Sequence, residues 1–236
     1  MFTGSAEVYD AIYREFKDYP AEASRIATLA RTTRPGCRSI LDVACGTGEH
    51  ASLLAARHDF AVDGLDLNAE FLRLARLKHP AGRFVQADMS DFHLGRRYDV
   101  VLCLFSSIGY LRTLDRVVQA LRCCAEHLAP DGVAIVEPWF EPDTLQPGYR
   151  TRHTATVDGC NVERLGVTEV EGRLSRIRFD YTIHGPEGIR HASELHELGL
   201  FTAAEMLAAF AAAGLEAQRD PEGLTGRGLY IARAAP

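Results

Sequence analysis

Through residues 39–137, short apolar runs alternate with longer segments in which apolar residues recur every three or four positions. The short runs have the length of strands, and the longer segments have the period of amphipathic helices. Strands that alternate with helices at this pitch predict a parallel sheet with helices on both faces. We expect strands at 39–44, 60–67, 84–87, 98–105 and 132–137, and helices at 49–57, 69–77 and 113–127.

The pattern changes on either side of this region. Residues 1–34 have a largely helical pattern, whereas residues 149–199 consist of runs rich in Thr, Val, Arg and His. Turn-forming pairs that contain glycine interrupt these runs at 158–159, 171–172 and 185–186. Strand-like runs separated by such pairs predict an antiparallel meander of three or four strands.

The helical period returns after the meander. Thr202 is an expected N-cap with Glu205 three residues later, and this Ala-rich helix is expected to end at Gly214. Two last strands are predicted at 215–219 and 228–232. We therefore expect one α/β domain with a β insertion between the fifth and sixth strands of its sheet. Its segments are an N-terminal helical segment at 1–34, an α/β core at 35–140, an antiparallel β insertion at 141–200, and a segment at 201–236 that completes the core.

The composition narrows the choice of partners. Of 236 residues, 47% are apolar and 25% are charged, and the formal net charge is −6. Nucleic acids and anionic membranes select an excess of Lys and Arg, so this balance argues against both and favours a small molecule. The chain has no apolar run of the roughly 18 residues that a spanning helix needs, and its start lacks a secretory signal, which predicts a cytoplasmic protein. The six cysteines form no CxxC pair, so we expect free thiols and no metal site.

The most informative segment is LDVACGTGEHA at residues 41–51, an apolar run that enters a glycine turn at the start of a helix. Gly46 and Gly48 allow the backbone to turn tightly and approach a ligand, and the helix N-terminus presents oriented N–H groups. Asp66 ends the next predicted strand, 18 residues after Gly48, where a carboxylate can accept hydrogen bonds from two ribose hydroxyls. These features indicate a site for a cofactor that contains a ribose.

Two cofactors fit this turn, a dinucleotide and S-adenosylmethionine. The carboxylate of Asp42 would repel a pyrophosphate, but it suits a ligand that carries an ammonium and a sulfonium. The glycine turn also follows about 40 residues of chain, whereas a NAD domain more often begins with its first strand. The pattern therefore favours S-adenosylmethionine and leaves a NAD-linked oxidoreductase as the alternative.

From Asp42 to Gly48 the sequence resembles the first motif of the class I S-adenosylmethionine-dependent methyltransferases. The resemblance continues at Asp66, at residues 88–89 after the third strand and at residues 104–107 after the fourth. It implies a Rossmann-like α/β methyltransferase sheet with helices on both faces, an N-terminal helical lid and an antiparallel β insertion. The cofactor-binding residues that it implies are Asp42, Ala44, Gly46, Gly48, Asp66, Leu67, Asp88, Met89 and Phe105.

A second resemblance spans nearly the whole chain. FSSIGYL at 105–111, VEPWF at 136–140, IRHASELHEL at 189–198 and GLTGRGLY at 223–230 resemble segments of the bacterial N-methyltransferases that dimethylate the 3-amino group of dTDP-3-amino-3,6-dideoxyhexoses. It implies a dTDP-amino sugar as the substrate and leaves a homodimer possible. The alternatives are a methyltransferase for a glycine-type amine or a natural-product hydroxyl, and a cofactor-binding module without turnover.

The acceptor site follows from the same resemblance. Tyr110, just past the fourth strand, and Tyr13 are expected to be the catalytic residues that orient the acceptor nitrogen. Arg227, between two glycines, is expected to bind the diphosphate. The structural alternatives are packing roles for the tyrosines and a solvated turn for Arg227. The histidines of the meander, among them His196, have no ligand spacing and are expected to be exposed or packed. The other substrate-binding residues expected are Tyr19, Glu137 and Trp139.

Overall fold

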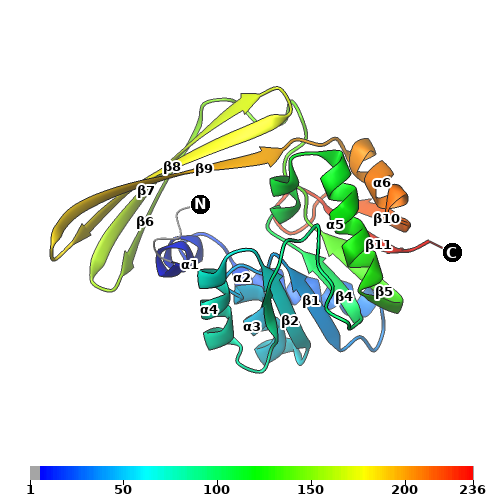
Figure 1. Ribbon diagram of the computed structural model, residues 1–236. Helices are drawn as coiled ribbons and strands as arrows, with labels where there is room; N and C mark the ends of the chain where they lie inside the picture. The colour runs from blue at the N-terminus through cyan, green and yellow to red at the C-terminus, as the bar shows by residue number, and fades with distance from the viewer. Residues whose placement is uncertain (1–5, 236) are drawn as a thin grey trace.

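The computed structural model describes residues 6–235, and the core of these residues is a seven-stranded sheet (Figure 1). In order across the sheet, its strands are β10 (Leu215–Asp220), β11 (Leu229–Ala234), β5 (Leu128–Val136), β4 (Tyr98–Cys103), β1 (Ser39–Val43), β2 (Ala61–Asp66) and β3 (Phe84–Gln86). Strands β1 to β5 are parallel, and β11 is antiparallel to both of its neighbours. The strand order reverses between β1 and β4, so the carboxyl ends of these two strands open a crevice at the sheet edge.

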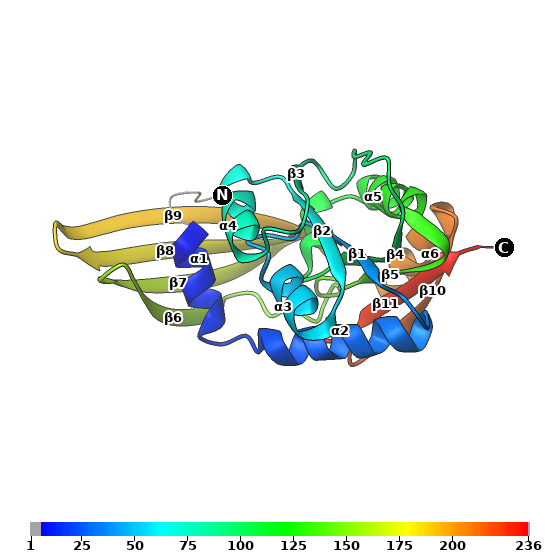
Figure 2. The same ribbon diagram turned by 90° about the horizontal axis from the view of Figure 1, so that it is seen from below.

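Helices cover both faces of this sheet, as the alternating pattern predicts. The helices are α1 (Ala6–Arg14), α2 (Tyr19–Thr33), α3 (Glu49–His58), α4 (Ala69–Lys78), the short 3₁₀ helix η1 (Ser107–Leu111), α5 (Leu114–Glu126) and α6 (Ala203–Ala212). Val100 and Leu102 of β4 pack toward α2, α3 and α4, whereas Val101 and Cys103 pack toward α5 and α6. Figure 2 shows α2 and α3 on one side of the sheet and α5 on the other. Successive strand side chains point to opposite faces, so a strand covered on both faces is apolar throughout.

The insertion between β5 and β10 is the predicted antiparallel meander, and it has four strands. They are β6 (Tyr149–Val157), β7 (Cys160–Glu171), β8 (Leu174–Gly185) and β9 (Gly188–Gly199). Gly159, Gly172 and Gly188 lie in the three hairpin turns with φ of 75°, 58° and 112°, a region that glycine adopts without strain. In Figure 1 this sheet extends away from the α/β core on the side of α1.

The helical pattern predicted for residues 1–34 corresponds to two helices, because residues 15–18 separate α1 from α2. Asp18 caps α2 by accepting a backbone hydrogen bond from its first turn. Helix α1 buries Val8 and Ile12 against the apolar face of the antiparallel sheet. It therefore lies between that sheet and the α/β core and covers the sheet edge as a lid (Figure 1). Residues 1–5 of the predicted segment lie outside the described residues.

All six cysteines are free thiols, as the sequence predicts, and Cys37, Cys103 and Cys124 are buried. Among residues 6–235, no helix is long and apolar enough to cross a membrane. Within the same range, no three His, Cys, Asp or Glu side chains are grouped in a way that would hold a metal ion.

The predicted cap of α6 gives a test of the fold. Thr202 Oγ1 accepts a hydrogen bond from Glu205 N, and Glu205 Oε2 accepts one from Thr202 N at 2.8 Å. Thr202→Ala leaves a backbone donor without its partner, so we expect the free energy of unfolding to fall by about 1 kcal/mol. Urea denaturation with an unchanged m-value measures this loss. The control is Thr32→Ala at an exposed position of α2, which should change stability by less than about 0.5 kcal/mol. Equal stability of the two variants would contradict the role of the cap.

Candidate functional site

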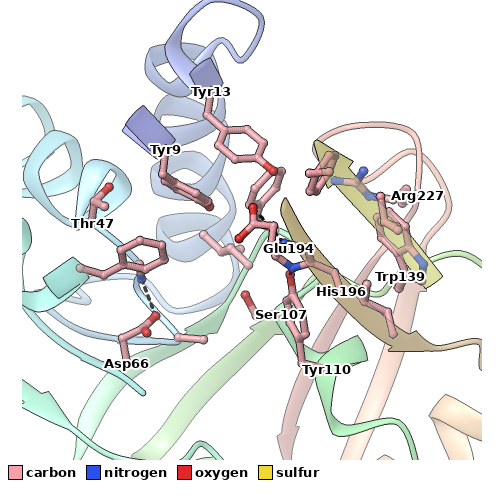
Figure 3. A pocket seen from close by; sticks show the side chains of 18 of the residues that line it. Tyr9, Tyr13, Thr47, Asp66, Ser107, Tyr110, Trp139, Glu194, His196 and Arg227 are labelled. Carbon is pink, nitrogen blue, oxygen red and sulfur yellow. Dashed lines mark hydrogen bonds and ion pairs between the residues drawn. The ribbon is translucent and has the colours of Figure 1, made fainter. Parts of the chain in front are cut away.

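A cavity of about 1110 Å³ opens at the carboxyl ends of β1, β2 and β4, beneath α1 and facing the antiparallel sheet (Figure 3). It brings together every residue that the sequence assigns to the site except Gly48 and Glu137. Residues from both ends of the chain and from six strands of the two sheets thus share one space. The predicted residues that line it are Tyr13, Tyr19, Asp42, Ala44, Gly46, Asp66, Leu67, Asp88, Met89, Phe105, Tyr110, Trp139 and Arg227.

Asp42 lies in β1, is 2% exposed, and has an Oδ2 atom for which residues 6–235 provide no hydrogen-bond partner. Burial raises the pKa of this carboxyl to about 7; His50 lowers it in part, and Asp66 adds to the rise. A buried carboxylate without a partner is costly, and a neighbouring cation compensates that cost. Asp42 therefore fits a ligand that carries an ammonium or a sulfonium, as S-adenosylmethionine does, and does not fit a pyrophosphate.

The glycine turn after β1 contains three residues with positive φ: Ala44 at 56°, Gly46 at 55° and Gly48 at 74°. A Cβ on Gly46 would meet no atom within 4 Å, so the backbone here faces open space in the cavity. A Cβ on Gly48 would lie 2.8 Å from the Cβ of Ala75 in α4. This glycine permits the close packing of the turn against α4, and it is not among the residues that line the cavity, so its assignment to the cofactor stays a prediction.

Asp66 at the end of β2 joins two backbone segments at the cavity. Its carboxylate accepts hydrogen bonds from Gly46 N and from Asn68 N, each at 2.8 Å. Burial raises the pKa of Asp66, and these N–H groups act against the rise. Asn68 is the N-cap of α4, so Asp66 is not needed for that role. Its remaining lone pairs are available to ribose hydroxyls. Asp88 also lines the cavity, but it is held by Ser90 and by Arg116, with an ion-pair distance of 2.8 Å.

The lid presents aromatic rings to the cavity. The ring centroids of Tyr9 and Tyr13 are 4.4 Å apart, and Tyr13 meets the edge of Phe105, the residue after β4, at 5.0 Å. On its other side α1 is tied to the core by charge: Arg14 lies 2.8 Å from Glu49, and Asp10 pairs with Lys78. Rings on one side and ion pairs on the other hold α1 over the cavity and exclude water from it.

Arg227 and Trp139 line the cavity opposite Asp66 (Figure 3). The guanidinium of Arg227 lies 5.5 Å from the Trp139 ring centre, and its Nη2 donates to Glu137 at 3.1 Å. Its Nε has no hydrogen-bond partner among the described residues. The assignment of Glu137 to the cavity lining needs correction: this carboxylate is 0% exposed and accepts from Phe105 N, Thr225 Oγ1 and Arg227. Glu137 therefore positions Arg227 from behind, because a buried carboxylate needs all its partners inside the protein.

The acceptor side also contains residues that the sequence analysis did not assign. The Tyr110 hydroxyl lies 2.7 Å from Nδ1 of His196, and His196 Nε2 lies 3.2 Å from Glu194 Oε1. Glu194 also accepts a hydrogen bond from the Tyr181 hydroxyl, and Arg164 lines the same wall. His196 is packed, as expected, against the rings of Tyr110 and Phe179, and it also lines the cavity. The available signal was spacing, because side chains two residues apart in a strand share a face.

Three comparisons with known proteins agree with this geometry. Residues 40–132 match a family model described as a methyltransferase domain. The chain is 43% identical to the dTDP-3-amino-3,6-dideoxy-alpha-D-glucopyranose N,N-dimethyltransferase of Streptomyces fradiae, over 95% of this chain and 89% of the relative. The crystal structure of Streptomyces venezuelae DesVI is 42% identical, with a TM-score of 0.91 over 98% of both chains. The S-adenosylmethionine-bound structure of CalS10, an amino pentose methyltransferase from Micromonospora echinaspora, is 38% identical, with a TM-score of 0.85 over 95% of both chains.

The raised pKa of Asp42 predicts how the affinity for S-adenosylmethionine depends on pH. A bound cation favours the carboxylate, so affinity should be full above pH 7 and should fall as protonation sets in below it, approaching tenfold per pH unit. Titration calorimetry between about pH 5.5 and 7.5 measures this fall, together with proton release in buffers of different ionisation enthalpy. Asp42→Asn should bind more weakly at high pH and lose the pH dependence. An affinity of the wild type that stays constant over this range would contradict the role of Asp42.

Proposed function

The chain belongs to the S-adenosylmethionine-dependent methyltransferases, and we propose that it methylates the amino group of a dTDP-linked 3-amino-3,6-dideoxy sugar. It is an N-methyltransferase of amino sugars that uses S-adenosylmethionine, of the kind found in natural-product biosynthesis. The proposal adds the sugar class and the residues that act. A homodimer and a cytoplasmic location remain predictions.

The main support for this proposal is that acidic and basic side chains line opposite sides of the cavity. Figure 3 shows Asp66 and Arg227 on opposite sides of the cavity, with Tyr110 and Glu194 between them. Asp42 and Asp66 give the strand-end side negative charge that suits a cationic methyl donor. Basic side chains line the side formed by β6 and the loop before β11, where they suit an anionic diphosphate; they are Arg150, Arg152 and Arg227.

We assign the donor to the strand-end side. There Asp42 has an unpartnered carboxylate oxygen, Gly46 leaves open space, and the Asp66 carboxylate lines the cavity, held by the backbone N–H groups of Gly46, Leu67 and Asn68. These features fit S-adenosylmethionine. Its sulfonium carries a methyl group that a neutral amine can attack, with S-adenosylhomocysteine as the leaving group. The remaining residues assigned to donor binding line the same side of the cavity; they are Ala44, Leu67, Asp88, Met89 and Phe105.

The protein contributes to the reaction by orienting the acceptor nitrogen and by excluding water from the reacting atoms. Tyr13 from α1 and Tyr110 from η1 line the cavity between the donor side and Arg227, where their hydroxyls can orient the acceptor nitrogen. Holding the amine in line with the donor accounts for most of the rate that an enzyme can supply in a displacement of this type. Tyr19, 8% exposed, adds to the aromatic wall that excludes water.

The proposed activity can be tested directly. The protein is incubated with S-adenosylmethionine and dTDP-3-amino-3,6-dideoxy-alpha-D-glucopyranose, and mass spectrometry counts the methyl groups added to the sugar. We expect two, with an equal amount of S-adenosylhomocysteine per methyl group. The free amino sugar and glycine are parallel acceptors, and a reaction without acceptor is the control. Methylation of glycine alone would favour the simpler amine acceptor, and no product from any acceptor would favour a binding module.

The diphosphate assignment gives a separate prediction for Arg227. Arg227→Ala removes a planar, permanently charged donor and should weaken the binding of dTDP by about tenfold or more, which corresponds to about 1.5–3 kcal/mol. Calorimetry with dTDP in the presence of S-adenosylhomocysteine measures this loss. The affinity for S-adenosylhomocysteine should fall much less than that for dTDP, because Glu137 keeps its hydrogen bonds from Phe105 N and Thr225 Oγ1. Arg57→Ala, on the exposed part of α3, is the matched control and should bind dTDP as the wild type does. Equal dTDP affinity of the Arg227 variant and the wild type would reject the assignment.

A further inference from the structure

A chain of polar side chains crosses the acceptor wall of the cavity. It begins at the Tyr110 hydroxyl, passes through the imidazole of His196 and the carboxylate of Glu194, and ends at the Tyr181 hydroxyl. The His196 and Glu194 side chains are only 11% and 7% exposed. Packing alone does not account for such a chain. Burying a polar side chain costs free energy unless it has a hydrogen-bond partner, so polar side chains in this wall indicate a function.

We propose that His196, supported by Glu194, takes up the proton that the sugar ammonium must lose, and that the Tyr110 hydroxyl conducts this proton to it. The inference rests on the proposed function, because it requires an amine as the acceptor. It assigns to His196 and Glu194 a part in the reaction that the donor-binding motif does not involve.

The reaction needs such a step. An aliphatic amine is largely protonated near neutral pH and then has no lone pair with which to attack. Each methyl transfer also produces a new ammonium, which must lose a proton before a second transfer. Tyr110 is 37% exposed in the cavity, and bound donor and substrate would displace water from the space around the nitrogen. A proton acceptor within the wall resolves this conflict.

The step balances in atoms and charge. The N–H bond of the substrate breaks and leaves its electron pair on nitrogen, while the oxygen of Tyr110 receives the proton. The original hydroxyl proton of Tyr110 moves to Nδ1 of His196. Tyr110 is neutral before and after the step, and the positive charge passes from the substrate nitrogen to the imidazolium. The carboxylate of Glu194 lies beside that charge, and the proton leaves to water when the cavity opens.

The observed geometry suits this direction of transfer. With Tyr110 donating to Nδ1 of His196, the neutral imidazole carries its proton on Nε2, which faces Glu194 at 3.2 Å. Nε2 makes no hydrogen bond of good geometry within the described residues, and its contact with the Glu194 carboxylate strengthens when the ring becomes charged. The support from Glu194 is therefore largest for the imidazolium, as in other carboxylate-histidine pairs.

Neighbouring groups act on the tyrosine hydroxyls at the two ends of this chain from several elements. Arg164 of β7 lowers the pKa of both Tyr110 and Tyr181, whereas Asp66 at the end of β2 raises that of Tyr110, and Tyr13 of α1 faces the same space. Burial raises the pKa of Tyr110 well above its usual value, with further contributions from Tyr13, Glu194 and Asp66. Tyr110 therefore stays neutral and passes the proton on, and His196 is the group that retains it.

The test is the dependence of kcat on pH with saturating S-adenosylmethionine and dTDP-3-amino-3,6-dideoxy-alpha-D-glucopyranose. His196→Gln keeps a polar side chain beside Tyr110 but cannot be protonated. We expect its kcat to fall by about tenfold or more near pH 7 and to approach the wild-type value at about pH 9.5, where more of the amine is neutral. Tyr110→Phe, which removes the conducting hydroxyl, should show the same recovery at high pH. His191→Gln, at an exposed position of the same strand, is the control and should keep the wild-type profile.

A second measurement does not depend on turnover. In the complex with S-adenosylhomocysteine, NMR of labelled histidines reports the tautomer of His196, which should carry its proton on Nε2 in the wild type, and its ring signals should change in Tyr110→Phe and in Glu194→Gln. Ring signals of His196 that are the same in the wild type and both variants, or a loss of kcat in His196→Gln that is equal at all pH values, would overturn the proposal while the N-methyltransferase function stands. Absence of methyl transfer by the wild type to this substrate would overturn the proposed function as well.

Discussion

The carboxylate of Glu137 connects the two halves of the site. It is completely buried at the end of β5 and accepts hydrogen bonds from Phe105 N at 2.7 Å, from Thr225 Oγ1 at 2.7 Å and from Arg227 Nη2 at 3.1 Å. Phe105 belongs to the donor side of the cavity and Arg227 to the opposite side. A buried carboxylate is stable only when such partners are all present, so one charge fixes the β4 turn and the C-terminal loop relative to each other.

Helix α1 is held by unlike forces on its two sides. Toward the antiparallel sheet it buries Val8 and Ile12 in an apolar cluster, whereas toward the core its contacts include the ion pair of Arg14, a side chain 53% exposed, with Glu49. Exposed ion pairs contribute little to stability, and the burial of two large apolar side chains contributes more. On the core side α1 also packs Ala6 and Tyr9 against Phe71 and Leu74 of α4, so apolar contacts add to the ion pairs there. The lid is therefore tied both to the acceptor wall and to the α/β core.

The sequence predicted most of the fold because its signals are local. The apolar run of β4, the glycines of the hairpin turns and the pair Thr202 and Glu205 each depend on neighbours within a few residues. The donor side was equally accessible, since Asp42 and Asp66 end adjacent parallel strands, and their positions follow from the strand pattern. These parts of the site could be placed before any contact was known.

What the sequence could not show depends on contacts between distant segments. Gly48 was assigned to the ligand, but Ala75 lies against it, 27 residues further along the chain. Glu137 was assigned to the cavity, but its partners lie 32, 88 and 90 residues away. The role of His196 depends on Tyr110, which lies 86 residues away. A strand histidine looks the same in sequence whether it faces solvent or a tyrosine hydroxyl.

The difference between local signals and long-range contacts also explains why the donor site is easier to identify from the sequence than the acceptor site. The donor half is built from consecutive strand ends, so that its residues follow the regular pitch of the α/β core. The acceptor half is built from an inserted sheet, a helix at the start of the chain and a loop near its end, none of which is a strand end of the α/β core. Substrate choice and proton removal therefore both reside in the part of the molecule that the α/β core does not constrain, which is where function on a common fold is expected to differ.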